Sequence, residues 1–430
     1  MKQYVWIIAG GPMQVPMIGK VHHRGYGVIL TDGNEQCVAK EYLYDDDIFW
    51  CLDTYDEEGH IKLAGELRQS FNIIGVMAPS ADVGPTVSAI AETLGLPGVY
   101  RDVAQRVRNK IMMRILLGFP YPRYMPGQSY THNTIRTWER ENASPYPCVV
   151  KAVDNCASRG MSIVTSPGQM ESAVKKAFAA NKRASGVLIE QMLSGDEYST
   201  DWIIENGHAI YINGCYRPFR KWNKYTGERL YGVEAGIVNP IIYPPKTIHE
   251  ETNGILIDTR DITPIEPLEG MTSIATIAAR RLGVTEGWFK IDFINDKVFG
   301  WCVLECTTRC SGGWDSSHVA PLVGNNMYDI LLDYSIGLPL DKSRVGCHNG
   351  LYAVTYAPLY PEGKIDGWSG LDDAMTFASY IFPRSTEYIP KLIDSATRSM
   401  FIIAVGDSPC AAWTKAARAA KLITPRYVNV

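Results

Sequence analysis

The sequence lacks any run of 18 or more apolar residues, so we expect no membrane-spanning helix. It also lacks a strong excess of charge of either sign. The net charge is −4 and the pI is about 6.1, and neither value indicates a nucleic-acid or anionic-membrane surface. The apolar stretch at the N-terminus is too short for a signal peptide. Ten cysteines without a secretory signal therefore favour reduced thiols and a cytoplasmic location.

Several catalytic and nucleotide-binding motifs are missing as well. The sequence contains no G-x-S-x-G nucleophile elbow, no G-x-G-x-x-G dinucleotide pattern and no P-loop. Its cysteines form no C-x-x-C pair, so we expect no cysteine-ligated metal or iron–sulfur site, even though Cys302, Cys306 and Cys310 are spaced by four residues. No internal repeat is present. The chemistry must therefore be carried by another arrangement of residues.

Strand-like and helix-like segments alternate over the first 100 residues. A chain of 430 residues is too long for one core and predicts two to four domains. Alternation of this kind is typical of βαβ units around a parallel sheet, whose ligands usually bind at the carboxyl ends of the strands. The predicted strands are Val5–Ala9, Gly27–Thr31 and Ile73–Ala78, and the predicted helices are Met13–Arg24, Ile61–Phe71 and Thr86–Leu94.

The middle of the chain combines one basic helix with shorter strands. The pattern predicts a single helix over Asp102–Leu117. Strands at Cys148–Val153 and Ser162–Thr165 predict a hairpin whose small-residue loop could wrap an anion with its N–H groups. The strand Gly186–Leu193 runs into an acidic turn. Each of these features also has an ordinary structural reading, as a solvated face, a plain hairpin or an edge strand.

Two further strands, Trp288–Ile294 and Trp301–Cys306, each place one carboxylate among apolar neighbours. If residues 295–300 form the whole connection, with its centre near Val298, antiparallel pairing puts Asp292 opposite Glu305, with Cβ atoms roughly 5 Å apart. A tight turn at residues 295–296 would instead leave the two carboxylates out of step. Carboxylates this close repel unless a cation lies between them, and Mg²⁺ prefers such ligands. The alternative is an ordinary hairpin with two solvated carboxylates.

These pieces together resemble the ATP-grasp superfamily of carboxylate–amine ligases. The resemblance is to amino-acid ligases and to the branch that includes carbamoyl-phosphate synthase and biotin carboxylase. Five motifs in the right order make coincidence improbable, and they cover most of the chain. They are Asn109-Lys110, Val149-Val150-Lys151, the loop from Asn155 to Gly160, the strand from Leu188 to Glu197, and Lys290-x-Asp292 followed by Glu305-x-Thr307-x-Arg309.

The resemblance implies a site for ATP. Lys110 and Lys151 would hold the phosphates, and the loop that contains Ser158 would close over them. Backbone groups of Gln191 and Leu193 would recognise adenine, and an acidic residue just after this strand would bind ribose. The residues assigned to ATP in this way are Lys110, Lys151, Ser158, Arg159, Gly160, Glu190, Gln191, Leu193 and Glu197.

The resemblance also implies a metal and catalytic residues. The ligands of one or two Mg²⁺ ions, with Mn²⁺ as an alternative, would be Asp292, Glu305 and Thr307. The catalytic residues would be Arg309, Arg217 and Lys151, with the arginines steadying the carboxylate or acyl phosphate. The chain departs from the family pattern in three places. Thr307 replaces the usual asparagine ligand, Ala152 replaces a proline, and the phosphate loop is poor in glycine.

The implied fold class is mixed α/β and α+β. An N-terminal parallel-sheet domain would span residues 1–105, and a two-lobed ATP-grasp domain would span residues 106–335. Its small lobe would cover about 145–195 and its large lobe about 196–335. A C-terminal α+β part, 336–430, would complete the cleft, with strands at Leu351–Tyr356 and Met400–Val405 and a helix at Cys410–Leu422.

The implied function is an ADP-forming ligase that activates a small carboxylate as an acyl phosphate and couples it to an amine, such as an amino acid. Two alternatives stay open: carboxyphosphate or carbamoyl-phosphate chemistry on bicarbonate, and a non-catalytic ATP-binding protein with the same fold. The expected partners are small-molecule carboxylate and amine substrates, without nucleic acid or membrane. A homodimer is the default oligomeric state.

Overall fold

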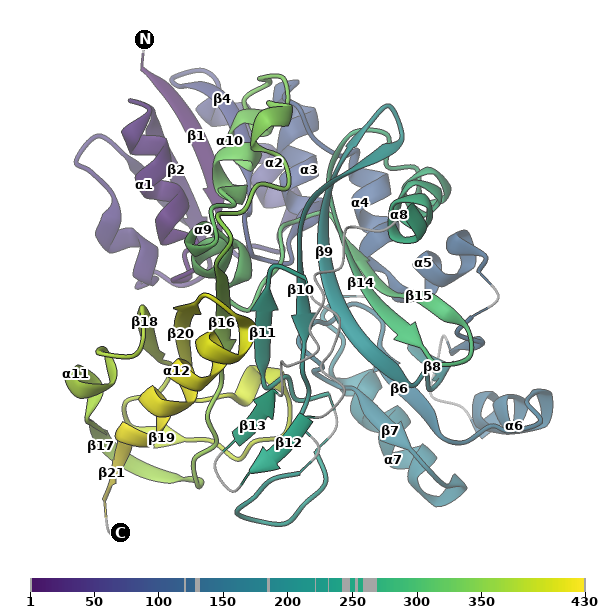
Figure 1. The fold of residues 1–430 in the computed structure, drawn as a ribbon. Helices are drawn as coiled ribbons and strands as arrows, with labels where there is room; N and C mark the ends of the chain where they lie inside the picture. Colours follow the sequence, from purple (N-terminus) through teal and green to yellow (C-terminus); the bar gives the residue numbers. More distant parts are fainter. Residues whose placement is uncertain are drawn as a thin grey trace.

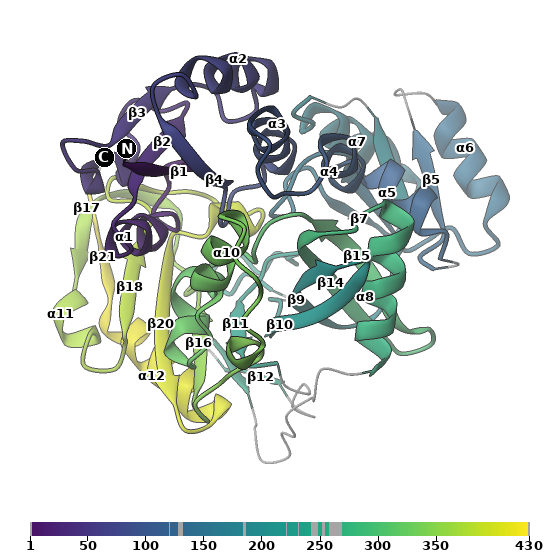
Figure 2. The same ribbon diagram turned by 90° about the horizontal axis from the view of Figure 1, so that it is seen from above.

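The computed structural model describes residues 2–119, 121–127, 132–183, 186–220, 222–230, 232–241, 248–251, 254–257 and 269–428. Figures 1 and 2 show the N-terminal unit and the C-terminal strands on one side of the molecule, and a small sheet with helices α6 and α7 on the other. Within the described ranges, no helix combines the length and apolar character needed to cross a lipid bilayer. The mixed α/β fold predicted from the sequence is confirmed.

The N-terminal unit is built on the predicted parallel sheet, which has the order β3-β2-β1-β4. Strand β3 was missed by the sequence analysis because it is a half-exposed edge strand with a weak apolar signal. Helix α2 begins four residues earlier than predicted because Asp56 caps it, accepting from the Gly59 N–H. The elements are β1 (Gln3–Ile8), α1 (Val15–His23), β2 (Gly27–Asp32), β3 (Ile48–Cys51), α2 (Glu57–Leu67), β4 (Asn72–Met77) and α3 (Gly84–Leu94).

The single helix predicted over residues 102–117 is wrong. Two helices are present, α4 (Arg101–Arg108) and α5 (Lys110–Leu117), and the chain breaks between them at Asn109. The Asn109 side chain accepts hydrogen bonds from the N–H groups of Ile111 and Met112, both at 3.1 Å, so it caps the second helix. Local capping therefore overrides a helical pattern that is continuous in the sequence.

A four-stranded antiparallel sheet, β5-β8-β6-β7, together with its helices is called the small lobe below; it includes β5, which precedes the predicted range of 145–195. The predicted hairpin of β6 with β7 is confirmed, and β8 pairs with β6 on its other side. The elements of this lobe are β5 (Tyr124–Gly127), α6 (His132–Glu141), β6 (Cys148–Ala152), β7 (Ser162–Val164), α7 (Pro167–Ala179) and β8 (Val187–Gln191).

An eight-stranded sheet, β15-β14-β9-β10-β11-β16-β20-β18, connects the large lobe to the C-terminal part. It crosses the predicted boundary at residue 336, because β16 pairs with β11 and β20 pairs with β16. One hydrophobic core joins the sheet to helices α4, α5, α8 and α12. The elements are β9 (Gly195–Glu205), β10 (His208–Arg217), β11 (Gly236–Asn239), α8 (Glu269–Leu282), β14 (Gly287–Asp296), β15 (Gly300–Thr307), β16 (Tyr352–Tyr356), β18 (Tyr380–Pro383), β20 (Met400–Gly406) and α12 (Pro409–Leu422).

The remaining elements are short. A two-stranded sheet pairs β12 with β13, and a three-stranded sheet has the order β19-β17-β21. Helix α10 packs beside the N-terminal unit (Figure 1). These elements are β12 (Ile248–Glu251), β13 (Gly254–Ile257), a π-helix (Asp315–Val319), α9 (Ala320–Leu322), α10 (Met327–Ser335), β17 (Gly363–Ser369), α11 (Leu371–Ala374), β19 (Tyr388–Ile389) and β21 (Thr424–Tyr427), with short 3₁₀ turns at Val38–Tyr42, Lys342–Arg344 and Ser395–Thr397.

Candidate functional site

The hairpin of β14 and β15 places Asp292 directly opposite Glu305, as predicted. The strands extend beyond the predicted ends and pair Asp296 with Gly300, which without a bulge would set Asp292 opposite Leu304. A β-bulge next to Asp292 inserts Leu304 as the extra residue and moves Glu305 into register. The predicted pairing is therefore confirmed, but the bulge produces it rather than a wide connection.

Cations surround the two carboxylates. Lys290 Nζ lies 2.5 Å from Asp292 Oδ2, and Arg217 Nη1 lies 3.3 Å from the same oxygen. Lys110 Nζ lies 2.9 Å from Glu305 Oε1. Burial alone would raise the pKa of Asp292, but Lys290 and Arg217 outweigh burial and hold this pKa well below its usual range. Asp292 is therefore ionised at neutral pH.

Two oxygen atoms beside this pair have no hydrogen-bond partner. Asp292 Oδ1 and Thr307 Oγ1 are both buried and unsatisfied among the described residues. Oxygen donors of this kind fit a hard divalent cation such as Mg²⁺. No group of three or more His, Cys, Asp or Glu residues in the described ranges could hold a metal ion. A cation here would consequently take its other ligands from phosphate oxygens or water.

Glu190 pairs with Lys151 on the neighbouring strand and with Arg114, which reaches the hairpin. Lys151 Nζ lies 2.5 Å from Glu190 Oε2, and Arg114 pairs with the other carboxylate oxygen. Arg114 also donates to the carbonyls of Val303 and Leu304, at 2.6 and 2.8 Å. Burial would raise the pKa of Glu190, but Arg114 and Lys151 lower it to about 2. The structure thus uses Glu190 to orient Lys151.

The loop between β6 and β7 has an unusual backbone. Ala157, Ser158 and Gly160 have positive φ angles of 55°, 61° and 74°. A Cβ at Gly160 would lie 2.4 Å from Ala180, so only glycine fits there. The Ser158 hydroxyl donates to the Gly232 carbonyl at 2.9 Å. Turns that combine right- and left-handed residues can form concave N–H nests for anions, so this loop stays the candidate phosphate loop.

The segment expected to contact adenine differs in part from the prediction. The Gln191 N–H, one of its candidate donors, already donates to the Arg123 carbonyl at 2.8 Å, and the Gln191 side chain accepts from Arg123 Nε at 3.1 Å. The Leu193 side chain instead belongs to an apolar cluster that includes Leu304 and the stacked rings of Tyr121 and Phe299. The flat rings and the apolar side chains of this cluster suit contact with a purine ring. Tyr121 and Leu304 were not identified from the sequence.

Arg217 lies between three carboxylates. Besides Asp292, it pairs with Glu234 at 2.8 Å and approaches Glu197 at 3.7 Å. Burial raises the pKa of Glu197, and Arg217 opposes this rise. Glu234 was not predicted from the sequence, because it follows a part of the chain without a strand signal. Lys290 was recognised only as part of a motif, without a role of its own.

Arg309 follows β15 on a loop anchored to the N-terminal unit. The Cys310 N–H donates to the Pro79 carbonyl at 3.1 Å, and Ser311 donates to the buried Asp201 carboxylate. Arg309 Nε is buried and unsatisfied, and the nearest carboxylate oxygen, on Asp82, lies 3.9 Å away. The N-terminal unit therefore contributes to the site through Asp82, which the sequence analysis missed.

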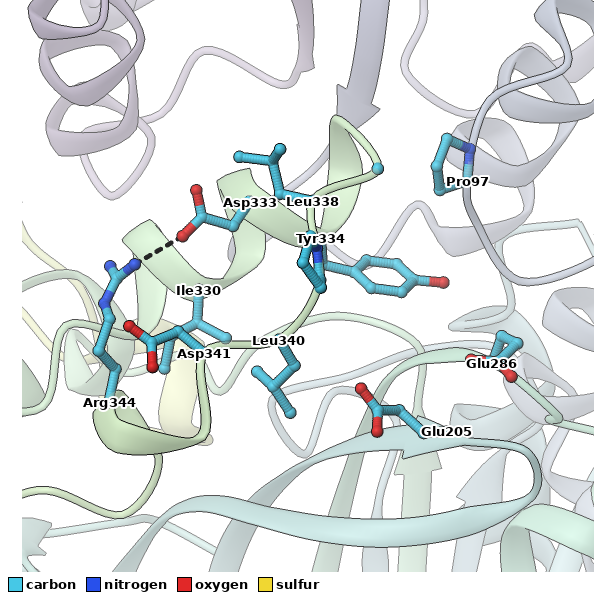
Figure 3. Close-up of a pocket in the computed structure, with 12 residues that line it drawn as sticks. Pro97, Glu205, Glu286, Ile330, Asp333, Tyr334, Leu338, Leu340, Asp341 and Arg344 are labelled. Carbon is cyan, nitrogen blue, oxygen red and sulfur yellow. Dashed lines mark hydrogen bonds and ion pairs between the residues drawn. The ribbon is translucent and has the colours of Figure 1, made fainter.

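A separate pocket of about 310 Å³ lies away from these groups (Figure 3). It is lined by Glu205 and Glu286, at the ends of β9 and β14 remote from Asp292, and by an ion pair of Arg344 with Asp333 at 2.6 Å. Glu205 is eight residues along β9 from Glu197, which corresponds to roughly 26 Å of extended strand. This pocket is not part of the site described above.

Comparison with known proteins agrees with the sequence resemblance. Residues 144–257 match the sequence family described as the ATP-grasp domain. No curated protein sequence matches the chain.

Solved structures match the fold over nearly the whole chain. An L-amino acid ligase from Bacillus licheniformis has a TM-score of 0.74 at 19% identity, with coverage of 100% of this chain and 99% of that one. An N5-carboxyaminoimidazole synthase from Aspergillus clavatus, in complex with ADP and 5-aminoimidazole ribonucleotide, has a TM-score of 0.66 at 13% identity, with 98% of both chains covered. The biotin carboxylase domain of a 2-oxoglutarate carboxylase from Hydrogenobacter thermophilus, with MgADP, ADP and bicarbonate, has a TM-score of 0.63 at 14% identity, with 94% and 86% covered.

Proposed function

We propose, from the premise that this chain contains an ATP-grasp domain and has the fold of the ligases named above, that it is an ATP- and Mg²⁺-dependent carboxylate–amine ligase. The observation that carries the proposal is the opposed pair Asp292 and Glu305, with one oxygen on Asp292 and another on Thr307 that have no hydrogen-bond partner in the described part of the chain. ADP and MgADP occur in structures of the same fold, which supports ATP as the nucleotide.

The residues around the pair can perform the steps that this reaction needs. Lys110 and Lys151 each lie within 3 Å of a carboxylate oxygen. When ATP binds, each lysine would exchange this carboxylate for phosphate oxygens. Mg²⁺ held by Asp292 and Glu305 would neutralise charge on the phosphates, and Mn²⁺ would suit the same oxygens. Arg309 would orient the substrate carboxylate, and Arg217 would balance the negative charge of Asp292.

In this reaction the substrate carboxylate attacks the γ-phosphorus, the bond from phosphorus to the ADP oxygen breaks, and an acyl phosphate forms. An amine then attacks the acyl carbon and displaces phosphate, losing a proton. Phosphoryl transfer requires mainly positioning and charge neutralisation from the protein. This requirement explains why the site consists of cations and carboxylates and needs no serine or cysteine nucleophile.

Incubation with Mg-ATP, hydroxylamine and a panel of carboxylic acids tests the proposal. We expect hydroxamate and ADP with at least one acid, because hydroxylamine traps an acyl phosphate. Formation of AMP would contradict the mechanism. Nucleotide binding without turnover on any acid would favour a non-catalytic protein of this fold, and turnover only with bicarbonate would favour carboxyphosphate chemistry.

The variant Glu305→Gln tests the metal assignment. It removes one charge opposite Asp292, so we expect turnover to fall by about 100-fold or more while the fold is retained, as measured by ADP release and circular dichroism. Glu205→Gln is the matched control, since this carboxylate lies at the far end of the same sheet. An active Glu305→Gln protein would show that the metal ligands are elsewhere.

A further inference from the structure

Arg108 is a nearly buried cation without a hydrogen-bond partner at two of its nitrogens. It is the last residue of α4, its side chain is 11% exposed, and its Nε and Nη2 are unsatisfied among the described residues. The nearest carboxylate oxygen, on Asp154, is 3.9 Å from Nη2. Asp154 already accepts from the N–H groups of Lys182 and Arg183, at 2.7 and 2.6 Å. A charge buried in this way is costly unless an anion joins it.

The surroundings of Arg108 lie at the ligand-binding edge of the N-terminal sheet. Its guanidinium carbon is 4.8 Å from the ring centre of Tyr55, which follows β3. The carboxyl ends of parallel strands are where ligands usually bind in such folds. A pocket of about 420 Å³ lies against Tyr55 at this edge, and Lys182 and Arg183 also line it. The pocket therefore opens beside the ring that the Arg108 guanidinium contacts.

Tyr55 also connects Arg108 to the site that contains Arg309. Burial raises the pKa of the Tyr55 hydroxyl, the charge of Asp82 raises it further, and Arg108 and Arg159 oppose this rise. Asp82 carries the carboxylate nearest to Arg309 Nε, which likewise has no hydrogen-bond partner among the described residues. A Cβ added at Gly84 would meet both Thr308, which precedes Arg309, and Ala104 on α4, so the helix that ends at Arg108 and the loop that carries Arg309 lie against the same turn of the N-terminal unit.

We propose that Arg108, next to Tyr55, binds a second carboxylate that does not react. The inference rests on the proposed function, in which Arg309 orients the carboxylate that is activated. One of the two substrates is then doubly charged: either the acid is a dicarboxylate such as an acidic amino acid, or the amine is an amino acid with a free carboxylate. Bidentate pairing with a carboxylate suits the planar guanidinium of Arg108.

Direct titration of the nucleotide-free protein tests the subsite without relying on turnover. The probes are L-glutamate, glutarate, L-alanine and L-alaninamide, with binding followed by calorimetry. Arg108→Gln removes the charge and Arg108→Lys keeps it. Arg106→Gln, on the same helix, is the control, because Arg106 pairs with Asp102 at the surface. We expect the wild type to bind at least one carboxylate probe, and Arg108→Gln to weaken it about tenfold or more, equivalent to about 1.4 kcal/mol. Arg108→Lys should recover part of this loss.

Kinetics with the same variants distinguish the two sources of the carboxylate. If the acid substrate supplies it, Arg108→Gln raises the KM for glutamate or glutarate in the hydroxylamine assay and leaves the KM for alanine unchanged. If the amine supplies it, hydroxamate formation is unaffected, while the KM for alanine as the amine rises and that for alaninamide does not. Either pattern, with kcat within about threefold of wild type, supports a positioning role.

Three results would overturn the subsite: no binding of any carboxylate probe to the wild type, equal affinities in wild type and Arg108→Gln, or equal loss with Arg106→Gln. Each of them can occur with normal Mg-ATP binding, in which case the proposed function stands. Absence of Mg-ATP binding and of ADP formation, together with intact carboxylate binding that depends on Arg108, would instead overturn the proposed function and leave the subsite in place.

Discussion

At the scale of single residues, the site is a set of buried charges held in place by one another. Lys110 is paired with Glu305, Lys151 with Glu190, and Arg217 with Glu234, each across more than one element of the fold. Buried ion pairs of this kind contribute little net stability compared with apolar contacts, but removing one member leaves the other as an uncompensated charge. Their value is that they pre-orient cations for an anionic ligand.

Glu190→Gln tests this view of the ion pairs. Glu190 is 1% exposed and neutralises both Arg114 and Lys151, so we expect the variant to lose about 3–5 kcal/mol of unfolding free energy at pH 7. In the folded protein the pKa of Glu190 is about 2, below its ordinary value of 4.5, so the contribution is present above pH 4.5 and is lost as the pH falls towards 2. Urea unfolding at pH 7 and at pH 3 should therefore show a smaller difference between variant and wild type at pH 3.

The matched control is Glu141→Gln, whose partner Arg140 is exposed at the surface of α6. Its unfolding midpoint should equal that of the wild type at both pH values. A Glu190→Gln protein as stable as this control would mean that Arg114 and Lys151 do not need the carboxylate.

Sequence patterns identified the charges of the site better than their partners. Asp292, Glu305 and the two lysines stand in recognisable motifs, and the structure brings them together through the predicted pairing. Asp82, Arg108 and Glu234 carry no such pattern. They come close to the site only through contacts between segments far apart in the chain, and such contacts leave no local signal in one sequence.

At the scale of elements, short-range chemistry decides where each piece begins and ends. Apolar spacing suggested one helix over residues 102–117, whereas the Asn109 side chain satisfies the first N–H groups of a new helix. The same break directs the Lys110 N–H to the Val153 carbonyl at 3.1 Å, which ties α5 to the end of β6. The bulge at Leu304 has a similar effect, since it sets the register of the carboxylates. Neither caps inside a helical pattern nor bulges are visible in apolar periodicity.

Asn109→Ala tests the cap. The variant leaves two N–H groups of α5 without an acceptor, so we expect a loss of about 1 kcal/mol in unfolding free energy, measured by urea denaturation. Because the cap fixes the residue before Lys110, the affinity for Mg-AMPPNP should also fall. Asn109→Asp keeps an acceptor and should restore stability. Equal stability of the alanine variant and the wild type would show that the turn between α4 and α5 forms without the cap.

At the scale of the whole molecule, the continuous sheet makes the C-terminal part a support for the site. Strands β16 and β20 extend the same sheet that contains β9 and β14, and α12 lies on it. The N-terminal parallel sheet was predictable from alternating strands and helices. The eight-stranded sheet was not, because β11 and β16 pair across more than 100 residues and each strand alone has only a short apolar pattern.

Trp413→Ala tests whether the sheet unfolds as one unit. Trp413 on α12 is 1% exposed, packs edge-on against Tyr356 at 5.3 Å, and shares one core with Trp202 on β9. We expect a loss of about 3–5 kcal/mol. Because the core is shared, hydrogen exchange followed by mass spectrometry should show faster exchange in β9 and β14 as well as in β16 and β20.

Trp50→Ala, at an exposed position on β3, should leave exchange in all four strands unchanged. Faster exchange confined to β16, β20 and α12 would show that the C-terminal part is an independent unit attached to the site, and that the large lobe holds the carboxylates in register without it.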